Sequence, residues 1–199
     1  MRGFFDDVRL MAGLLGLLWL VLLIDLAVFH GRLIVFGIVP RKPHGLIGIP
    51  LAPLLHAGPS HLAANSGPFF VLGLMVLRHG RRAFWAASLV IVLLGGFATW
   101  CIGPAHTVHV GASALIFGWF GFVVVAAWRA PRLSSVAVAS LAILWYGLGV
   151  VLGLSPLQYG VSWQGHLTGL FAGALAASGL PLSRRSGNAP SMRVVRRRR

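Results

Sequence analysis

The chain has 199 residues, of which 57% are hydrophobic and 10% are charged, whereas soluble domains carry about 25% charged residues. This composition excludes a soluble globule and predicts an integral membrane protein. Three aspartates, no glutamate and a single cysteine exclude a paired-carboxylate glycosidase, an internal disulfide and an H-E-x-x-H zinc site. We therefore expect no metal and no cofactor, and any chemistry must use Ser, His, Asn, Tyr and backbone groups.

Long apolar runs indicate the fold class, because a membrane-spanning helix needs about 20 mostly apolar residues. The sequence predicts an all-α bundle of six transmembrane helices, at residues 10–29, 61–77, 83–102, 113–128, 133–154 and 163–182. The six spans form one packed unit in this interpretation, so residues 1–182 are expected to be one domain. The first run is long and lacks a convincing cleavage site, which argues against a signal peptide.

The connection between the first two spans, residues 31–60, is long and contains both apolar segments and prolines. A loop of this length is uncommon unless it has structure or function of its own. Its apolar content predicts that it lies in or on the outer leaflet of the membrane. The alternative is an ordinary extracellular loop with a small apolar core.

Positive charge sets the expected orientation. With a cytoplasmic N-terminus, fourteen of the 17 Lys and Arg residues lie inside, so the positive-inside rule predicts that both termini are cytoplasmic. We expect a multi-pass protein of a bacterial inner (plasma) membrane. The tail 183–199 is basic and predicted to be disordered. Polybasic segments beside a membrane span more often reflect membrane topology and attraction to anionic lipid than nucleic-acid binding, so no nucleic-acid partner is expected.

Polar residues recur at the starts of three apolar runs. His61 and Asn65 begin the second span, Ser113 begins the fourth, and His166 lies near the start of the sixth. In the predicted topology these three spans run in the same direction, so all four side chains lie near the outer leaflet. Polar groups in a membrane are costly and tend to mark function. Three helix N-termini aimed at one region would also favour an oxyanion.

Each of these residues also has a structural explanation when taken alone. Ser113 could cap a helix, and His166 could be a buried histidine bonded to a carbonyl. His61 and Asn65 are one turn apart and could form an interhelical pair. The joint arrangement favours a site. Gly169 and Gly173 form a G-x-x-x-G on the His166 face, and such small residues allow close helix packing.

Three motifs together resemble a known family. Gly111-Ala112-Ser113, His166 followed by Gly169 and Gly173, and His61-x-x-x-Asn65 are similar to the motifs of the rhomboid intramembrane serine proteases, in their order and spacing. The resemblance covers all six spans. It implies a catalytic dyad of Ser113 and His166. It also implies an oxyanion and substrate-binding site formed by His61, Asn65, the Gly111 segment and the Ser113 backbone N–H.

The same resemblance assigns three neighbouring positions. His56 matches a histidine often found there, and Phe117 stands where the family often has a tyrosine packed on the catalytic histidine. Ala114 replaces the second glycine of the usual G-x-S-G. A Trp-Arg pair common in the first loop is missing, and Arg41 with Lys42 is its possible substitute. Because no carboxylate is placed at the site, ring packing by Phe117 is expected to orient His166.

The resemblance implies an intramembrane serine endopeptidase that cleaves transmembrane segments of single-span membrane proteins and works in the lipid bilayer without a cofactor. One alternative is a catalytically inactive rhomboid-like membrane protein that binds client transmembrane helices. A small transporter is a further alternative, but it would call for inverted repeats, and none is visible. The oligomeric state and the partner of Asp25 stay open at this point.

Overall fold

The computed structural model describes residues 2–158 and 160–181. These residues form helices and helical turns, and the only β-pairing among them is an isolated bridge between Ile38 and His109. The all-α fold class predicted from the apolar runs is therefore confirmed. The basic tail 183–199 lies outside the described residues.

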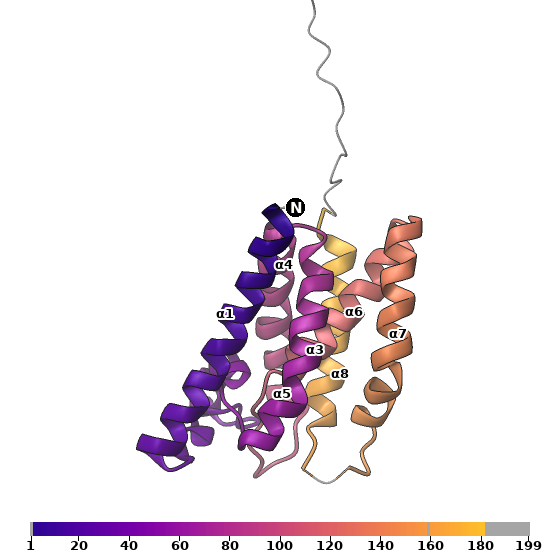
Figure 1. Cartoon of the computed structure of the whole chain (residues 1–199). Helices are drawn as coiled ribbons and strands as arrows, with labels where there is room; N and C mark the ends of the chain where they lie inside the picture. Colours follow the sequence, from indigo (N-terminus) through magenta and orange to yellow (C-terminus); the bar gives the residue numbers. More distant parts are fainter. Residues whose placement is uncertain (1, 159, 182–199) are drawn as a thin grey trace, which may run out of the picture.

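Six long helical runs of the described chain pass back and forth between two ends of a bundle (Figure 1). They are α1 (Arg2–Ile24) with the π-helical turn η1 (Asp25–Phe29), α3 (Pro59–Leu77), α4 (Arg81–Val90) continuing through η5 (Ile91–Gly95) into α5 (Gly96–Ile102), α6 (Ser113–Arg129), α7 (Leu133–Gly153) and α8 (Trp163–Gly179). Each predicted apolar run corresponds to one of these helical runs, although α7 ends at Gly153 and α8 at Gly179, before the predicted ends at residues 154 and 182. The first helix begins at Arg2 rather than at residue 10, because the ion pair between Asp6 and Arg9, at 3.6 Å and one turn apart, supports helix beyond the apolar run.

Four runs of the described residues are long and apolar enough to cross a membrane, namely Gly3–Phe29, Pro59–Leu77, Arg81–Ile102 and Leu133–Gly153. Helix α6 is apolar but has only 17 residues. Helix α8 also has 17 residues and carries Gln164, His166 and Thr168 near its start. Most residues of α6 and about half of those of α8 are buried in the bundle. A helix covered by protein does not need the apolar length that contact with lipid demands.

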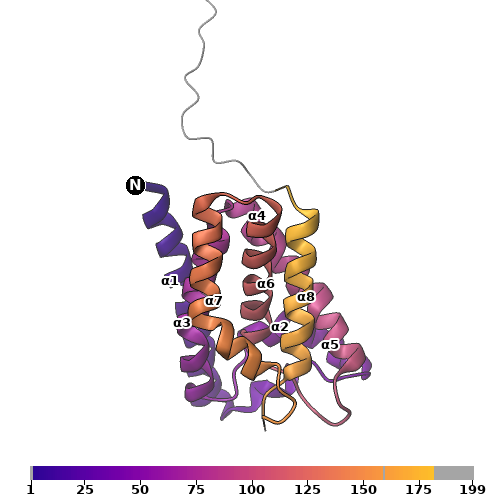
Figure 2. The same cartoon turned by 90° about the vertical axis from the view of Figure 1, so that its right-hand side faces the viewer.

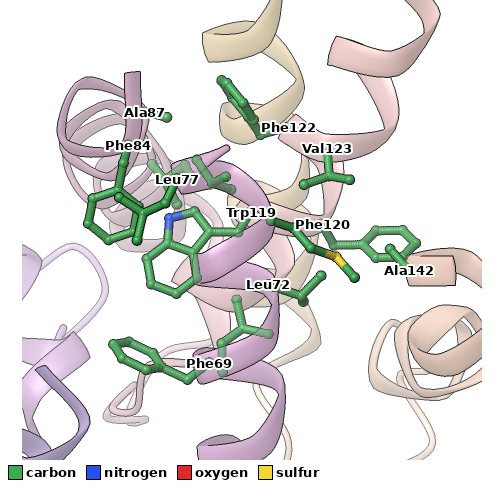
Figure 3. Close-up of a cluster of buried hydrophobic side chains, with 14 of the residues drawn as sticks. Phe69, Leu72, Leu77, Phe84, Ala87, Trp119, Phe120, Phe122, Val123 and Ala142 are labelled. Atoms are coloured by element: carbon green, nitrogen blue, oxygen red, sulfur yellow. The ribbon is translucent and has the colours of Figure 1, made fainter. Parts of the chain in front are cut away.

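The main core lies where α3, α4 and α6 meet, and Trp119 is at its centre (Figure 3). The Trp119 ring is 5.0 Å from the Phe69 ring and 5.3 Å from the Phe84 ring, measured between centroids. Its Nε1–H donates to the Ser88 hydroxyl at 3.0 Å, so the buried indole keeps a hydrogen bond. This cluster fixes α6 from one side.

Helices α6 and α8 pack backbone to backbone. A methyl group added at Gly169 would overlap the Ala114 carbonyl, and one added at Gly173 would overlap the Gly118 carbonyl. At the far end of α6, the Arg129 guanidinium donates to the carbonyl of Ala177 in α8. Close approach through small residues is how helices pack tightly in lipid. The two helices are therefore joined along their length.

The connection between α1 and α3 has structure of its own. It contains the turns η2 (Arg32–Phe36), η3 (Pro43–Ile47) and η4 (Ala52–Leu54) and the short helix α2 (Gly48–Leu51). Ile38, Ile49 and Ala52 form a small core against Val92 and Trp100. This arrangement agrees with the alternative of a loop with a small apolar core.

Two charged side chains hold this connection in place. The Asp25 carboxylate accepts a hydrogen bond from the Leu33 N–H at 3.0 Å, which answers the question of what Asp25 pairs with. The Arg41 guanidinium donates to the carbonyls of Gly103 at 2.6 Å and Cys101 at 3.1 Å, at the end of α5. Arg41 therefore anchors the loop to a helix C-terminus, where a cation is favourable.

The two ends of the bundle differ in what they contain. The start of α1 and the end of α8 lie at one end, together with the connections from α3 to α4 and from α6 to α7 (Figures 1 and 2). The structured loop and the starts of α3, α6 and α8 lie at the other end. All the polar residues singled out from the sequence therefore belong to the second end.

Candidate active site

Ser113 and His166 meet across the α6–α8 contact. Ser113 is the first residue of α6, and His166 lies in the first turn of α8. The Ser113 Oγ and the His166 Nε2 are 2.8 Å apart, which is hydrogen-bond distance. The two residues are far apart in sequence, and the glycine contacts between their helices bring them together.

The other nitrogen of the His166 ring determines which tautomer is present. His166 Nδ1 lies 2.8 Å from the carbonyl oxygen of Gly153, at the end of α7. A carbonyl can only accept, so Nδ1 carries the proton and donates it to Gly153. Nε2 then bears a lone pair and accepts the hydrogen bond from the Ser113 hydroxyl. This is the arrangement in which a histidine can act as a general base.

The face of the His166 ring is covered by Phe117. The two rings are stacked, with centroids 4.0 Å apart and planes 14° from parallel. A methyl group at Gly153 would lie 2.5 Å from Phe117 Cζ and 3.1 Å from His166 Nδ1, so only glycine fits between them. Ring and carbonyl together orient the imidazole. The Asp25 carboxylate is engaged by Leu33 instead.

His61, Asn65 and Gly111 lie next to one another on the other side of Ser113. Gly111 has φ +112°, and a methyl there would lie 2.9 Å from His61 Nε2 and 3.6 Å from Asn65 Nδ2. His61 Nδ1 accepts from the Ala57 N–H at 3.4 Å, so its Nε2 carries the proton. Asn65 Nδ2 is buried and has no hydrogen-bond acceptor among the described residues. Two N–H donors therefore adjoin the backbone that leads into Ser113.

His56 is hydrogen-bonded to the backbone that leads into Ser113. Its Nε2 accepts a hydrogen bond from the Ala112 N–H at 3.3 Å, directly before Ser113. Burial, assisted by the neighbouring His61, lowers the pKa of His56 from 6.5 to about 4. The ring is therefore neutral at physiological pH and stays able to accept that bond.

A second pair of side chains links the loop before α6 to the start of α8. His109 Nδ1 lies 2.5 Å from the Ser162 hydroxyl, which also caps α8 by accepting the Gly165 N–H at 3.2 Å. Burial lowers the pKa of His109, which favours its neutral form. No role for either residue was predicted from the sequence. The available signal was a serine immediately before an apolar run, which is typical of a helix cap.

A cavity of about 230 Å³ opens beside the dyad. Ser113, His166 and Asn65 line it together with residues of α7 such as Tyr146 and Val150. The other lining residues are mostly apolar and come mainly from α3, α6 and α7. The arrangement can hold an extended segment of chain against a hydroxyl nucleophile, a neutral imidazole base and N–H donors that could stabilise a developing oxyanion.

Known protein families include one that matches most of this chain. The family model for the rhomboid domain matches residues 43–182. An uncharacterized protein of Mycobacterium tuberculosis is 43% identical over 170 residues, which are 81% of this chain and 70% of that protein. An uncharacterized protein of Mycobacterium leprae is 40% identical over 171 residues, 82% of this chain and 67% of its own.

A candidate rhomboid protease of Bacillus subtilis, YdcA, is 30% identical over 123 residues, 61% of each chain. The matched residues of the family model include all three polar helix starts and the glycines that join α6 to α8. The chain belongs to the rhomboid family of membrane proteins.

Proposed function

We propose that this protein is an intramembrane serine endopeptidase that cleaves transmembrane segments of single-span membrane proteins with a Ser113–His166 dyad. The observation that carries the proposal is the 2.8 Å contact between Ser113 Oγ and His166 Nε2 while Gly153 holds the other ring nitrogen. If Ser113 only capped a helix and His166 were only structural, neither the proton on His166 Nδ1 nor the adjoining cavity would be required.

The first half of the reaction forms an acyl-enzyme. Ser113 Oγ attacks the carbonyl carbon of the scissile peptide while His166 Nε2 takes the hydroxyl proton. The imidazolium then gives that proton to the amide nitrogen, the C–N bond breaks, and the amine product leaves. The substrate acyl group remains as an ester on Ser113.

The second half restores the enzyme. His166 Nε2 takes a proton from a water molecule, whose oxygen attacks the ester carbonyl. The ester bond to Ser113 breaks, and the serine oxygen recovers the proton from His166. In both halves the carbonyl oxygen becomes an oxyanion. We assign its stabilisation to Asn65 Nδ2, His61 Nε2 and the Ser113 backbone N–H, because the first N–H groups of a helix have no intrahelical acceptor.

The lengths of the helices support a site below the membrane surface. We propose that all six helical runs cross the bilayer, with α6 and α8 shielded by their neighbours. Helix α6 has 17 residues, so at 1.5 Å per residue it is about 26 Å long, which is less than the about 30 Å of a bilayer's hydrocarbon core. Ser113, at the start of this short helix, then lies under the outer surface, where the cavity beside α7 can receive a chain from the lipid.

The direction of insertion rests on charge. Both termini are proposed to be cytoplasmic in a bacterial inner membrane, because most cations are then inside. Cysteines at positions 107 and 186, each in a background lacking Cys101, would be labelled from opposite sides of the membrane. Labelling of Thr107→Cys only from the cytoplasm would exclude this orientation, and with it access of water to the dyad from outside.

The main test combines cleavage with serine reactivity. Purified protein is incubated with a panel of single-span substrates and, separately, with a fluorophosphonate probe. Wild type should cleave at least one substrate and be labelled by the probe, whereas Ser113→Ala should do neither. Ser178→Ala is the matched control, because that exposed hydroxyl donates only to the Ala174 carbonyl of its own helix.

Two outcomes would overturn the proposal. A folded Ser113→Ala protein that still cleaves would remove this serine from the chemistry. Wild type that binds client helices without cleavage and without probe labelling would identify an inactive membrane binding protein instead.

A further inference from the structure

A second and larger cavity lies at the other end of the bundle from the dyad. Its volume is about 580 Å³, and its walls come from the start of α1, the end of α3, the second half of α6 and the start of α7. These segments meet at the end where the N-terminus lies (Figure 2). In the six-span arrangement this end reaches the headgroup region of one leaflet. None of the proposed catalytic residues lines this cavity.

The mouth of this cavity is positively charged. Arg78, at the end of α3, and Arg132, directly before α7, both line it and are exposed. The carboxylate that lines the cavity, Asp7, forms a salt bridge with Arg81 at 3.3 Å. No carboxylate of the described residues forms a salt bridge with Arg78 or Arg132. The two guanidinium groups therefore leave a net positive charge at the mouth.

His79 lies close to the same two positive charges. His79 lines the cavity, and burial, with the positive charges of Arg78 and Arg132, lowers its pKa. Ser134 and Ser135, in the first turn of α7, add two hydroxyl groups beside the N–H groups of a helix start. Guanidinium, hydroxyl and helix N–H groups are the donors that proteins use for phosphate.

The deeper walls are apolar. Leu74 and Met75 of α3, Val123 of α6 and Val138 of α7 line the cavity below its charged mouth. A water molecule occupies about 30 Å³, so a cavity of 580 Å³ is far larger than an inorganic phosphate needs. A cationic mouth above an apolar interior matches a ligand with a phosphate at one end and a hydrocarbon chain at the other.

We propose that this cavity binds an anionic phospholipid, with its phosphodiester between Arg78 and Arg132 and one acyl chain against α3 and α7. The charge complementarity at the mouth selects an anionic headgroup over a zwitterionic one. The apolar walls distinguish a bound lipid from a free phosphate. The proposal does not depend on the protease assignment, because no residue of the dyad or of the oxyanion side takes part.

The test measures binding by the whole protein in a neutral detergent. Thermal unfolding and native mass spectrometry are followed while phosphatidylglycerol, phosphatidylcholine with the same acyl chains, or glycerol 1-phosphate is added. Phosphatidylglycerol should raise the unfolding temperature saturably and remain bound as a single adduct. Phosphatidylcholine and glycerol 1-phosphate should do neither.

Charge variants locate the headgroup. Arg78→Gln with Arg132→Gln should weaken phosphatidylglycerol binding about 10- to 30-fold, as expected for two cations that each contact an anionic lipid. Arg82→Gln with Arg196→Gln is the matched control, since it removes the same charge from an exposed position of α4 that does not line the cavity and from the basic tail. The control should bind as wild type does. Equal weakening in both pairs would mean unspecific attraction to a basic surface and would overturn the proposal.

A variant that keeps every charge examines the acyl chain separately. Val138→Phe places a larger side chain in the apolar wall and should reduce binding at least tenfold while Arg78 and Arg132 remain. It also provides a test if the double arginine variant does not fold. Unchanged phosphatidylglycerol binding by a folded Val138→Phe protein, or equal binding of phosphatidylcholine by wild type, would exclude the proposed site.

Discussion

Helices α7 and α8 both lie against α6, yet they contact it in different ways. Helix α8 meets α6 through backbone atoms at Gly169 and Gly173. Helix α7 has 21 residues, of which only Ala139, Ala142 and Gly153 are buried. The Leu144 side chain of α7 remains 77% exposed. Helix α8 is thus packed closely against α6, whereas most of the α7 surface faces the surroundings of the protein.

The different packing of α7 and α8 corresponds to two requirements of the site, a fixed distance between the dyad atoms and access for a substrate. Atoms that must keep a fixed distance, Ser113 Oγ and His166 Nε2, lie on the two helices that are packed backbone to backbone. Helix α7 contributes part of the lining of the cavity that would receive a substrate. Helix α7 contributes one orienting atom to the dyad, the Gly153 carbonyl oxygen. Stable geometry and access are therefore assigned to different helices.

The largest expected effect is the loss of cleavage rate when Ser113 of α6 or His166 of α8 is replaced. Ser113→Ala and His166→Ala should each lower the cleavage rate by a factor on the order of 10⁴–10⁶, and the double variant should be no worse than either, because the two residues act as one unit. The measurement is cleavage per folded molecule, with folding followed by thermal unfolding in detergent. Two independent losses that multiply in the double variant would contradict a dyad.

Asn65 tests the oxyanion side, which neither α7 nor α8 provides. Asn65→Ala should lower kcat by about 10²–10³, because one donor to the oxyanion is lost. Ser66→Ala is the control on the same helix, since that hydroxyl donates to the Leu62 carbonyl and accepts from Trp19. The control should keep the rate per folded molecule. A rate for Asn65→Ala within twofold of wild type would remove Asn65 from the site.

The packing of α8 is tested by stability rather than rate. Gly173→Ala should lower the free energy of unfolding by about 1–3 kcal/mol, because the methyl would overlap a backbone carbonyl that cannot rotate away. Gly179→Ala, on the same helix with no atom within 4 Å of the added methyl, should have little effect. Thermal unfolding of the two variants in one detergent makes the comparison. Equal stability would show that α6 and α8 are not packed as closely as described.

The smallest effect is expected on α7. Gly153→Ala should displace the Phe117 or His166 ring and lower the rate about 10- to 100-fold, because small errors in position are costly for catalysis. Gly147→Ala, earlier on the same helix and outside the lining of the cavity beside the dyad, adds a methyl in ordinary van der Waals contact with Ile143 and should leave the rate unchanged. Cleavage by the two variants at matched folded concentration decides the matter. Equal rates would mean that the space at Gly153 does not hold the Phe117 and His166 rings in position.

The helices were predictable from the sequence because apolar runs and polar helix starts are local signals. The meeting of Ser113 with His166 was also within reach, since alternating direction places every second helix start at one end. The Gly153 carbonyl could not be predicted, because a backbone oxygen has no side-chain signature. The His109–Ser162 contact joins residues far apart in sequence, and neither is unusual on its own. The anchoring of the loop by Arg41 depends on where α5 ends.

The glycine contacts between α6 and α8 determine how the geometry of the dyad responds to temperature. Glycine has no rotamers, so nothing at this contact gains side-chain freedom on warming. The Ser113–His166 distance should then change little between cold and warm conditions. The Gly153 carbonyl depends on the sparsely packed α7, so warming should loosen its hold on His166 Nδ1 first. Nitrogen-15 NMR of His166 would record this as growing exchange between the two ring tautomers while the two helices stay together.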